Sequence, residues 1–434
     1  MSSQTAILRT NRNFRLLFFG QTVSQLGDWF NSVAVFALLL DLTGSATAVA
    51  WMMIVQFLPM AIVGPIAGVV VDRVDRRRLM IGTDLVRGVL VLGLLLVRTR
   101  EQVWLAYVVM ALTVTGTAFF EPARTATIPN VTSKDELMPA NALASATWAA
   151  MLAIGASIGG LVTAIAGREI AFVINGASFF TSAWFISRTT YDSTPTPKAP
   201  LQGWYALSGL PDMLEGFDYV RRRAHISAIM FVKAGWGLAG GVLLLLTVFG
   251  QRVFPIAGST AAGIGVLYGA RGIGAGLGPM ALRWLLGQTP TTMRRSIGPA
   301  YFMVGGFYIA LAAAQGLPLA AVCVLLAHFG GSILWVFSTV LLQMEVPDEF
   351  RGRVFAAELA LVTLTSSISS YATGYALDDL GWSPRTLAFW LGSGFAVPGG
   401  LWLVMNARWK AAERLETPST TQSGEEEMLE GRIG

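Results

Sequence analysis

The segment GPIAGVVVDRVDRRRLM, residues 64–80, joins two long apolar runs through a few strongly charged residues. The run before the charges spans about residues 46–71, and the run after them spans about 79–97. Each run is close to the ~20 residues that a helix needs to cross about 30 Å of hydrocarbon. The segment therefore predicts a short polar turn between two membrane-spanning helices.

The rest of the chain repeats this pattern. Of its 434 residues, 54% are hydrophobic and only 13% are charged, which is too apolar for an ordinary soluble protein. We therefore expect an all-α, polytopic membrane protein with twelve transmembrane helices. The expected spans lie near residues 14–40, 46–71, 79–97, 102–121, 140–166, 169–187, 226–250, 258–286, 296–315, 317–342, 354–377 and 385–407.

The net charge of +5 is explained by basic residues in the loops on one side of the expected membrane helices. With a cytoplasmic N-terminus, 23 of the 31 Lys and Arg residues fall on cytoplasmic segments, five on the opposite side and three within helices. Cytoplasmic loops of membrane proteins carry such an excess of basic residues. We expect both termini to be cytoplasmic in a bacterial-type inner membrane, and the charge gives no reason to infer a nucleic-acid partner.

The chain contains two similar halves. The first helix of each half begins near residues 14 and 226, and the loop KDELMPAN (134–141) recurs as PDEFRGRV (347–354) at nearly the same offset. Between the halves lies a Pro-rich polar linker. The expected organisation is a six-helix bundle over 1–190, a cytoplasmic loop with an amphipathic helix over 191–225, a second bundle over 226–410, and a disordered acidic tail over 411–434.

The charged turn resembles the G-x-x-x-D-R-x-x-R-R signature of the major facilitator superfamily, with Gly68, Asp72, Arg73, Arg76 and Arg77 in the matching positions. The resemblance implies two pseudo-symmetric six-helix bundles and a latch between them on the cytoplasmic side. An aspartate at a helix end can face the positive N-terminus of another helix, which gives the latch a physical basis. Alternatively, the arginines only set the topology.

Further charged residues are expected near the same membrane face. Asp84 with Arg87 and Glu121 with Arg124 lie at depths that suit pairing with this turn, although contact with a substrate remains the alternative. Arg353, in the related loop of the second half, is assigned to the same cytoplasmic gate.

Five local segments resemble one branch of the superfamily, the macrolide efflux pumps and the enterobactin exporter. They are NRNFRLLFFGQTVSQLGDWF (11–30), MIGTDLVRG (80–88), FFEPARTATIPNVTSKDELMPANAL (119–143), EGFDYVRRR (215–223) and VPDEFRGRV (346–354). This resemblance implies export of an amphipathic small molecule of the antibiotic or siderophore type, which would give drug resistance or siderophore export. Lysophospholipid transporters are neighbours of this branch, so a lysophospholipid flippase or importer is the alternative.

The fifth expected span carries Gly155, Gly159 and Gly160, but Ala156 stands where exporters of this superfamily often have a proline. The antiporter signature is therefore incomplete. The small residues also permit a second interpretation, close packing against a neighbouring helix.

The first expected span contains GQTVSQLGDWFNS, residues 20–32, with an acid in the middle of an apolar helix. Gln21, Gln25, Asp28 and Ser32 follow at steps of four, three and four, so they share one helix face. A carboxylate at this depth should face a cavity, pair with a cation or hold a proton. We expect Asp28 to carry protons, and Gln21, Gln25, Asn31 and Ser32 to bind substrate, unless Asp28 only fixes helix packing.

Four further residues are candidates. Arg271 is expected near the bilayer midplane, where it needs Asp28, Glu358, carbonyl groups, or a carboxylate or phosphate of the substrate. Glu358 and His328 are alternative proton carriers, although a lone buried histidine is also a common packing residue. Trp148 is a candidate wall for a bulky ligand, although many aromatic residues face lipid.

No nucleotide-binding loop, zinc-like cluster or catalytic Ser/His/Asp arrangement is readable in the sequence. We expect no enzymatic activity, metal or cofactor, and coupling to an ion gradient in place of ATP hydrolysis. The prediction is a monomeric, proton-coupled transporter with a small-molecule substrate that works by alternating access in the lipid bilayer. A membrane receptor or scaffold is a third possibility.

Overall fold

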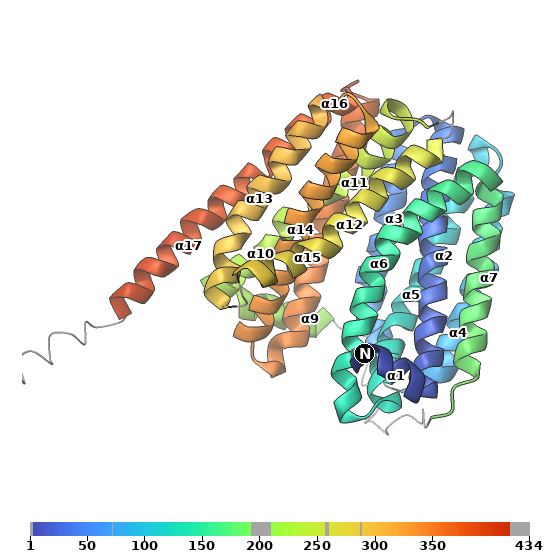
Figure 1. Ribbon diagram of the computed structural model, residues 1–434, viewed down its shortest axis with the longest axis horizontal. Coiled ribbons are helices and arrows are strands. Elements are labelled where there is room, and N and C mark those ends of the chain that lie inside the picture. The colour runs from blue at the N-terminus through green and yellow to red at the C-terminus, as the bar shows by residue number, and fades with distance from the viewer. Residues whose placement is uncertain (1–2, 72, 192–209, 257–259, 287–288, 417–434) are drawn as a thin grey trace, which may run out of the picture.

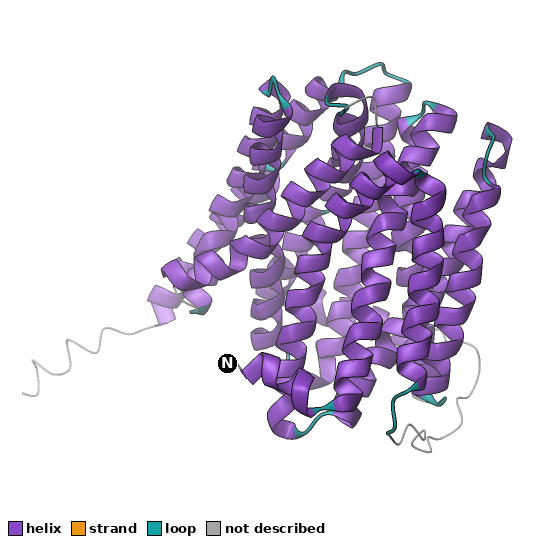
Figure 2. Ribbon diagram, turned by 45° about the vertical axis from the view of Figure 1, so that its right-hand side comes forward, coloured by secondary structure: helices purple, strands orange, loops and turns teal. Residues whose placement is uncertain are grey.

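The computed structural model describes residues 3–71, 73–191, 210–256, 260–286 and 289–416, and these residues are almost entirely helical (Figures 1 and 2). The first six membrane helices are α2 (Arg12–Thr43), α3 (Ala46–Val71), α4 (Arg76–Leu92), α5 (Val103–Val131), α6 (Lys134–Ala166) and α7 (Arg168–Ser187). The second six are α10 (Ala224–Trp236) with α11 (Ala239–Val248), α12 (Thr260–Leu286), α13 (Pro290–Ala313), α14 (Leu317–Glu345), α15 (Asp348–Asp378), and α16 (Pro384–Gly394) with α17 (Ala396–Glu416). The expected twelve spans are confirmed.

Shorter elements complete the described part of the chain. They are α1 (Ser3–Thr10), the 3₁₀ turns η1 (Gly93–Leu96) and η2 (Arg100–Gln102), α9 (Leu210–Arg221), and the π-helical turn η3 (Phe249–Val253). Helix α9 lies within the segment for which the sequence predicts an amphipathic helix. Helix α17 continues to Glu416, and the remaining residues of the expected acidic tail lie outside the described residues.

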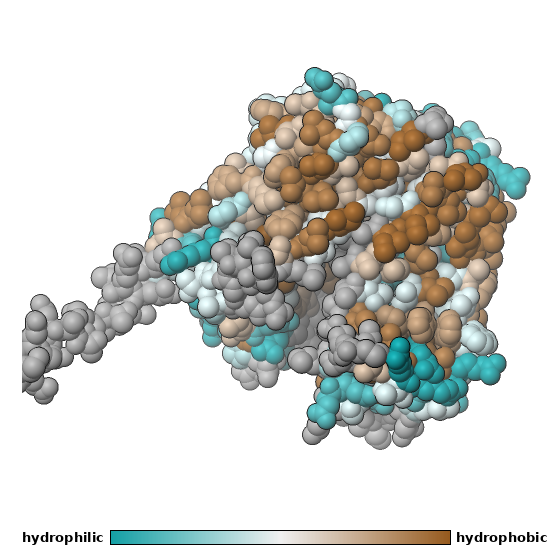
Figure 3. Space-filling view, in the orientation of Figure 1, coloured by the Kyte–Doolittle hydropathy of each residue, from teal (hydrophilic) through white to brown (hydrophobic). Residues whose placement is uncertain are grey.

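The outer side surfaces of the molecule are in contact with lipid. Over the described residues alone, ten of these twelve membrane helices are long and apolar enough to cross a membrane. Large apolar side chains such as Ile165 and Val397 are 78% and 65% exposed, which would be costly in water over so large a surface. Figure 3 shows hydrophobic residues, coloured brown, as a band between more polar ends. We call the end that carries α1 and α9 the α9 end, and the opposite end the α16 end (Figure 1).

The helices form two bundles that touch along two helix pairs. In the first bundle α2 packs on α6 and α7, and in the second bundle α14 packs on α12 and α13. Helix α6 packs on α12, and α3 packs on α15, across the bundle boundary. A Cβ added to Gly160 would lie 2.7 Å from the Cα of Gly265, so the α6–α12 contact requires glycine. Gly155 and Gly159 similarly admit α2, which confirms the packing role of this small-residue stretch.

Polar contacts close the gap between the bundles at the α16 end. Asp378, the last residue of α15, accepts hydrogen bonds from Ser45 Oγ (2.6 Å) and from the backbone N–H groups of Ala46 (3.0 Å) and Thr47 (2.7 Å) at the start of α3. Arg252 donates to the carbonyl of Gly44, also across the boundary, at 2.5 Å. At the α9 end the surface is hollowed between the bundles (Figure 3). The molecule is therefore closed at the α16 end and open toward the α9 end.

Candidate functional site: a polar cavity in the first bundle

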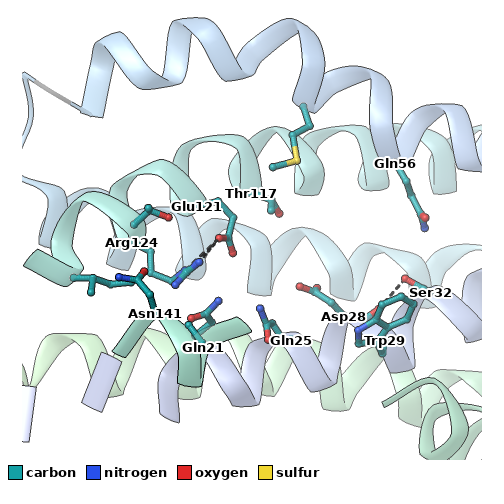
Figure 4. Close-up of a pocket in the computed structure, with 14 residues that line it drawn as sticks. Gln21, Gln25, Asp28, Trp29, Ser32, Gln56, Thr117, Glu121, Arg124 and Asn141 are labelled. Atoms are coloured by element: carbon teal, nitrogen blue, oxygen red, sulfur yellow. Dashed lines mark hydrogen bonds and ion pairs between the residues drawn. The ribbon is translucent and has the colours of Figure 1, made fainter. Parts of the chain in front are cut away.

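A cavity of about 700 Å³ lies against the first bundle (Figure 4). Its described wall comes from α2, α3, α5 and α6, and it combines amide, hydroxyl and charged groups with a few apolar side chains. The polar residues of this wall are Gln21, Gln25, Asp28, Ser32, Gln56, Thr117, Glu121, Arg124, Thr125 and Asn141. A cavity of this size can hold a drug-sized molecule.

The polar stripe of α2 forms one side of this cavity. Gln21, Gln25, Asp28 and Ser32 all line it, as their spacing predicts for residues on one helix face. Ser32 Oγ donates a hydrogen bond to the backbone carbonyl of Asp28 at 2.9 Å. The side-chain carboxylate of Asp28 points into the cavity (Figure 4). Trp29 covers the neighbouring part of the wall.

Asp28 differs from Glu121 and Asp84, the two acids nearest to it in the first bundle. Glu121, which also lines the cavity, is bound by Arg124 with Nη2 to Oε2 at 2.8 Å. Asp84 is fully buried and paired with Arg87. Among the residues that the structure describes, no basic side chain forms an ion pair with Asp28. The cavity therefore contains one carboxylate whose charge has no countercharge at contact distance.

Among the described residues, the arginines of the two pairs bind partners close to them in the first bundle. Arg87 lies 4.3 Å from the ring centre of Phe179 and 4.6 Å from that of Phe120, and it donates to Thr117 Oγ1 at 3.1 Å. Arg124 sits one helical turn after its partner Glu121. Each acid is three residues before its arginine, and this spacing on one helix face favours the local pair.

Three predicted substrate residues, Asn31, Trp148 and Arg271, are not part of the described cavity wall. Asn31 is buried on the other side of α2, where its Nδ2 lies 3.3 Å from Met110 Sδ. The side chain of Trp148 lies outside the described residues. The stripe that includes Ser32 excludes Asn31, because adjacent residues on a helix point in directions about 100° apart.

Arg271 is surrounded by aromatic rings. Its guanidinium carbon lies 5.7 Å from the ring centre of Tyr268 and 6.0 Å from that of Trp29, which itself lines the cavity. Within the described part of the chain it forms no ion pair, so neither Asp28 nor Glu358 is its anion in this conformation. Contact with the ring faces provides partial compensation for the buried charge.

His328 belongs to a packed cluster of the second bundle. Its Nε2 lies 2.8 Å from Tyr308 Oη, and the edge of Trp236 packs against its ring with centroids 5.8 Å apart. The side chain is 3% exposed, and it is absent from the described cavity wall. This geometry is that of a hydrogen-bonded packing residue.

Glu358 has a partner that the sequence analysis left out of the site. Lys233 Nζ lies 2.7 Å from Glu358 Oε2, deep within the second bundle. The hydropathy pattern suggests that Lys233 is shallow enough to reach the lipid headgroups, and this is wrong because the side chain is only 6% exposed. The available signal was the occurrence of one lysine and one glutamate within apolar helices, since each is costly unless paired.

The expected gate residues make contacts within their own bundles. Arg76 Nη1 donates to the carbonyl of Ala126 at 3.0 Å, and Arg77 donates to the carbonyl of Ser187. Arg73 Nη1 binds the carbonyl of Val69 at 3.2 Å. A Cβ added to Gly68 would meet no atom within 4 Å. Asp72 lies outside the described residues.

Arg353 binds a segment that precedes the second bundle. Its Nη1 lies 2.9 Å from Glu215 Oε1 of α9, and Gly216 allows α9 to approach the backbone of Arg353 itself. The residue assigned to the gate therefore anchors α9 to α15 in this conformation, in which the α9 end is open.

Comparisons with known proteins agree with this architecture. The sequence profile of the Major Facilitator Superfamily matches residues 17–359. BacE of Bacillus subtilis (strain 168), described as a bacilysin exporter, is 26% identical over 367 residues, which cover 82% of this chain and 87% of BacE. Macrolide efflux protein A of Streptococcus pyogenes is 34% identical over 131 residues, which cover 29% of this chain and 32% of that protein.

Solved transporters share the fold at much lower identity. The peptide transporter POT superposes with a TM-score of 0.74 at 13% identity, covering 94% of this chain and 99% of that chain. The nucleoside transporter NupG gives a TM-score of 0.70 at 12% identity, covering 91% and 98%. The family profile matches most of its length, and exporters are among its relatives, so the chain belongs to the major facilitator superfamily.

Proposed function

We propose that this transporter exports an amphipathic small molecule and that protons moving in the opposite direction drive the export. The observation that carries the proposal is the position of Asp28, an acid without an ion-pair partner among the described residues, on the polar wall of the cavity. A carboxylate in such a place changes its charge at modest cost when the cavity opens to a compartment of different pH. The other acids close to it are each held by an arginine.

The cavity wall favours an amphipathic substrate. Gln21, Gln25, Gln56 and Asn141 offer amide donors and acceptors, and Trp29 offers an apolar ring face. Such a mixture suits a molecule with several polar groups on an apolar frame. Two relatives are named for bacilysin and for macrolides, and by analogy the substrate class here is an antibiotic. The resemblance of local segments to the enterobactin exporter adds a siderophore as the second candidate.

The transport cycle follows from the two bundles. We propose that residues 1–190 and 226–410 move as two units, joined by the loop over 191–225, and rock about the α3–α15 and α6–α12 contacts. The excess of basic residues supports a cytoplasmic α9 end with both termini on that side, in a bacterial-type inner membrane. The conformation described here then faces the cytoplasm, where an exporter loads its substrate.

Transport by proteoliposomes tests the proposal. Purified protein is reconstituted, a pH gradient is imposed, and a panel of labelled macrolide, siderophore and lysophospholipid is offered. We expect gradient-driven accumulation of a macrolide or siderophore, and Asp28→Asn should bind the same ligand but lose the dependence on the gradient, because an amide exchanges no proton. Gln25→Ala is the matched control from the same stripe, and it should weaken ligand affinity while transport stays coupled.

Two results would change the conclusion. If Asp28→Asn still concentrates substrate when a pH gradient is imposed, Asp28 is not the coupling site. If only the labelled lysophospholipid moves, the protein is a lipid transporter on the same fold.

A further inference from the structure

We propose that a groove on the outer face of the second bundle binds one anionic phospholipid of the surrounding membrane. The groove has a volume of about 440 Å³ and lies between α13 and α14. Its described lining residues are Thr292, Arg295, Ser296, Pro299, Ala300, Met303, Phe329 and Ile333, none of which lines the central cavity. The proposal therefore concerns a second site, independent of the substrate site.

The groove faces the bilayer. Helix α13 packs on α14, α16 and α17, and Figure 1 shows it on the side of the second bundle that lies away from the first. Arg295 and Pro299 are exposed, and Phe302, which follows them on the same face of α13, has 44% of its surface exposed. An apolar ring exposed at this position meets lipid, and the molecule available to fill a neighbouring groove is a lipid.

The end of the groove near the start of α13 is polar and positively charged. Arg295 is exposed, and it makes no ion pair or hydrogen bond with the described residues, whereas its neighbour Arg294 has Nη2 3.9 Å from Glu345 Oε1. Thr292 and Ser296 lie one turn apart beside it. Because Pro299 has no N–H, the helical hydrogen bond to the Arg295 carbonyl is missing, and this oxygen remains free to accept one.

The other end of the groove is apolar. Met303 comes about 16 Å after Thr292 along α13, at 1.5 Å per residue, and Phe329 and Ile333 of α14 form the opposite wall. The groove thus changes from polar to apolar in the direction that leads from the headgroup region into the hydrocarbon. A lipid phosphate at Arg295, with the upper part of one acyl chain between Met303 and Phe329, matches both ends.

The charge of the groove selects the class of lipid. Guanidinium groups bind phosphate through paired N–H donors, and basic pockets between membrane helices recognise anionic headgroups. No acidic residue is among the described lining residues, so nothing there would hold the cationic group of a zwitterionic lipid. An anionic lipid is therefore favoured over one of the same chain length with a choline headgroup.

Native mass spectrometry of the full-length protein tests this inference. Delipidated protein in detergent is titrated with phosphatidylglycerol or with phosphatidylcholine of identical acyl chains. We expect one phosphatidylglycerol to bind selectively, and Arg295→Gln to weaken its binding about tenfold while leaving phosphatidylcholine unchanged. Arg408→Gln, which removes an exposed arginine of α17 outside the groove, is the matched control. Equal losses in the two variants would show a general charge effect and overturn the site.

A second pair of variants locates the lipid. Ile333→Trp fills the apolar end of the groove and should weaken binding of both lipids with Arg295 intact. Asp28→Asn changes only the central cavity and should leave phosphatidylglycerol binding unaltered. Retained binding in Ile333→Trp, or lost binding in Asp28→Asn, would place the lipid elsewhere and contradict the proposal.

Discussion

Lys233 Nζ lies 2.7 Å from Glu358 Oε2, and this ion pair joins α10 to α15 inside the second bundle. The two side chains are 6% and 3% exposed, and the ring of Trp335 covers the ammonium group at 4.7 Å. The second oxygen of Glu358 is buried without a partner in the described part of the chain. Because a proton on Glu358 would leave Lys233 without its countercharge, Glu358 suits the proposed proton transfer less well than Asp28 does.

The pair predicts a specific pattern of stabilities. Lys233→Met or Glu358→Leu alone leaves one buried charge uncompensated, which should lower stability by about 3–5 kcal/mol. The double variant Lys233→Met/Glu358→Leu removes both charges and should regain most of this loss. The measurement is the melting temperature of the purified proteins in detergent. A double variant whose loss equals the sum of the single losses would show that the two charges do not interact.

The sequence predicts those features that depend on local patterns. Twelve helices follow from the length and hydropathy of each run, which the surrounding lipid requires of any spanning segment. The stripe of Gln21, Gln25, Asp28 and Ser32 follows from helical periodicity alone, and the structure places all four on one cavity. The resemblance of residues 64–80 to a family signature identifies the fold to which these helices belong.

Features that depend on which helices pack together cannot be predicted from local sequence patterns. The Lys233–Glu358 pair joins residues 125 positions apart, and nothing near Lys233 in the sequence identifies its partner. Arg271 meets aromatic rings where the cost of its charge suggested an anion. The opening toward the α9 end is also a property of the assembled bundles and cannot be predicted from any local pattern in the sequence.

The contact between Gly160 and Gly265 predicts that adding a methyl group at Gly160 is more harmful than adding one at Gly306. Gly160→Ala should lower the melting temperature and slow transport, because its Cβ would lie 2.7 Å from a backbone carbon of α12. Gly306→Ala is the control, since no atom lies within 4 Å of the added Cβ, and alanine favours a helix by about 1 kcal/mol over glycine. A Gly160→Ala protein as stable as Gly306→Ala would contradict the close α6–α12 approach.

The distribution of basic residues predicts the sidedness of the molecule. In a background of Cys323→Ala, single cysteines replace Arg222, after α9, and Asp379, at the end of α15, both of which are exposed. An impermeant maleimide added to whole cells should label the cysteine at 379 and not the one at 222, because the α9 end is expected in the cytoplasm. Labelling of position 222 in intact cells would invert the topology and with it the proposed direction of loading.

Asp378 predicts how firmly the α16 end is closed. Its carboxylate accepts three hydrogen bonds at the first turn of α3, where the helix dipole also favours a negative charge. Asp378→Ala should therefore weaken the closed end by about 1–2 kcal/mol, in the range of a lost helix cap. The population open toward the α16 end would rise by about fivefold to thirtyfold.

The measurement is the rate at which an impermeant maleimide added from outside labels a cysteine in place of Ser32, on the wall of the cavity. Asp379→Ala is the matched control, because this exposed neighbour shows no side-chain contact with the first bundle in the described part of the chain. We expect faster labelling in Asp378→Ala and an unchanged rate in Asp379→Ala. Equal rates in the two variants would mean that the Asp378 carboxylate does not hold the bundles together. The α16 end would then be closed by the glycine contacts between α6 and α12 and by the packing of Gly374 on Thr47.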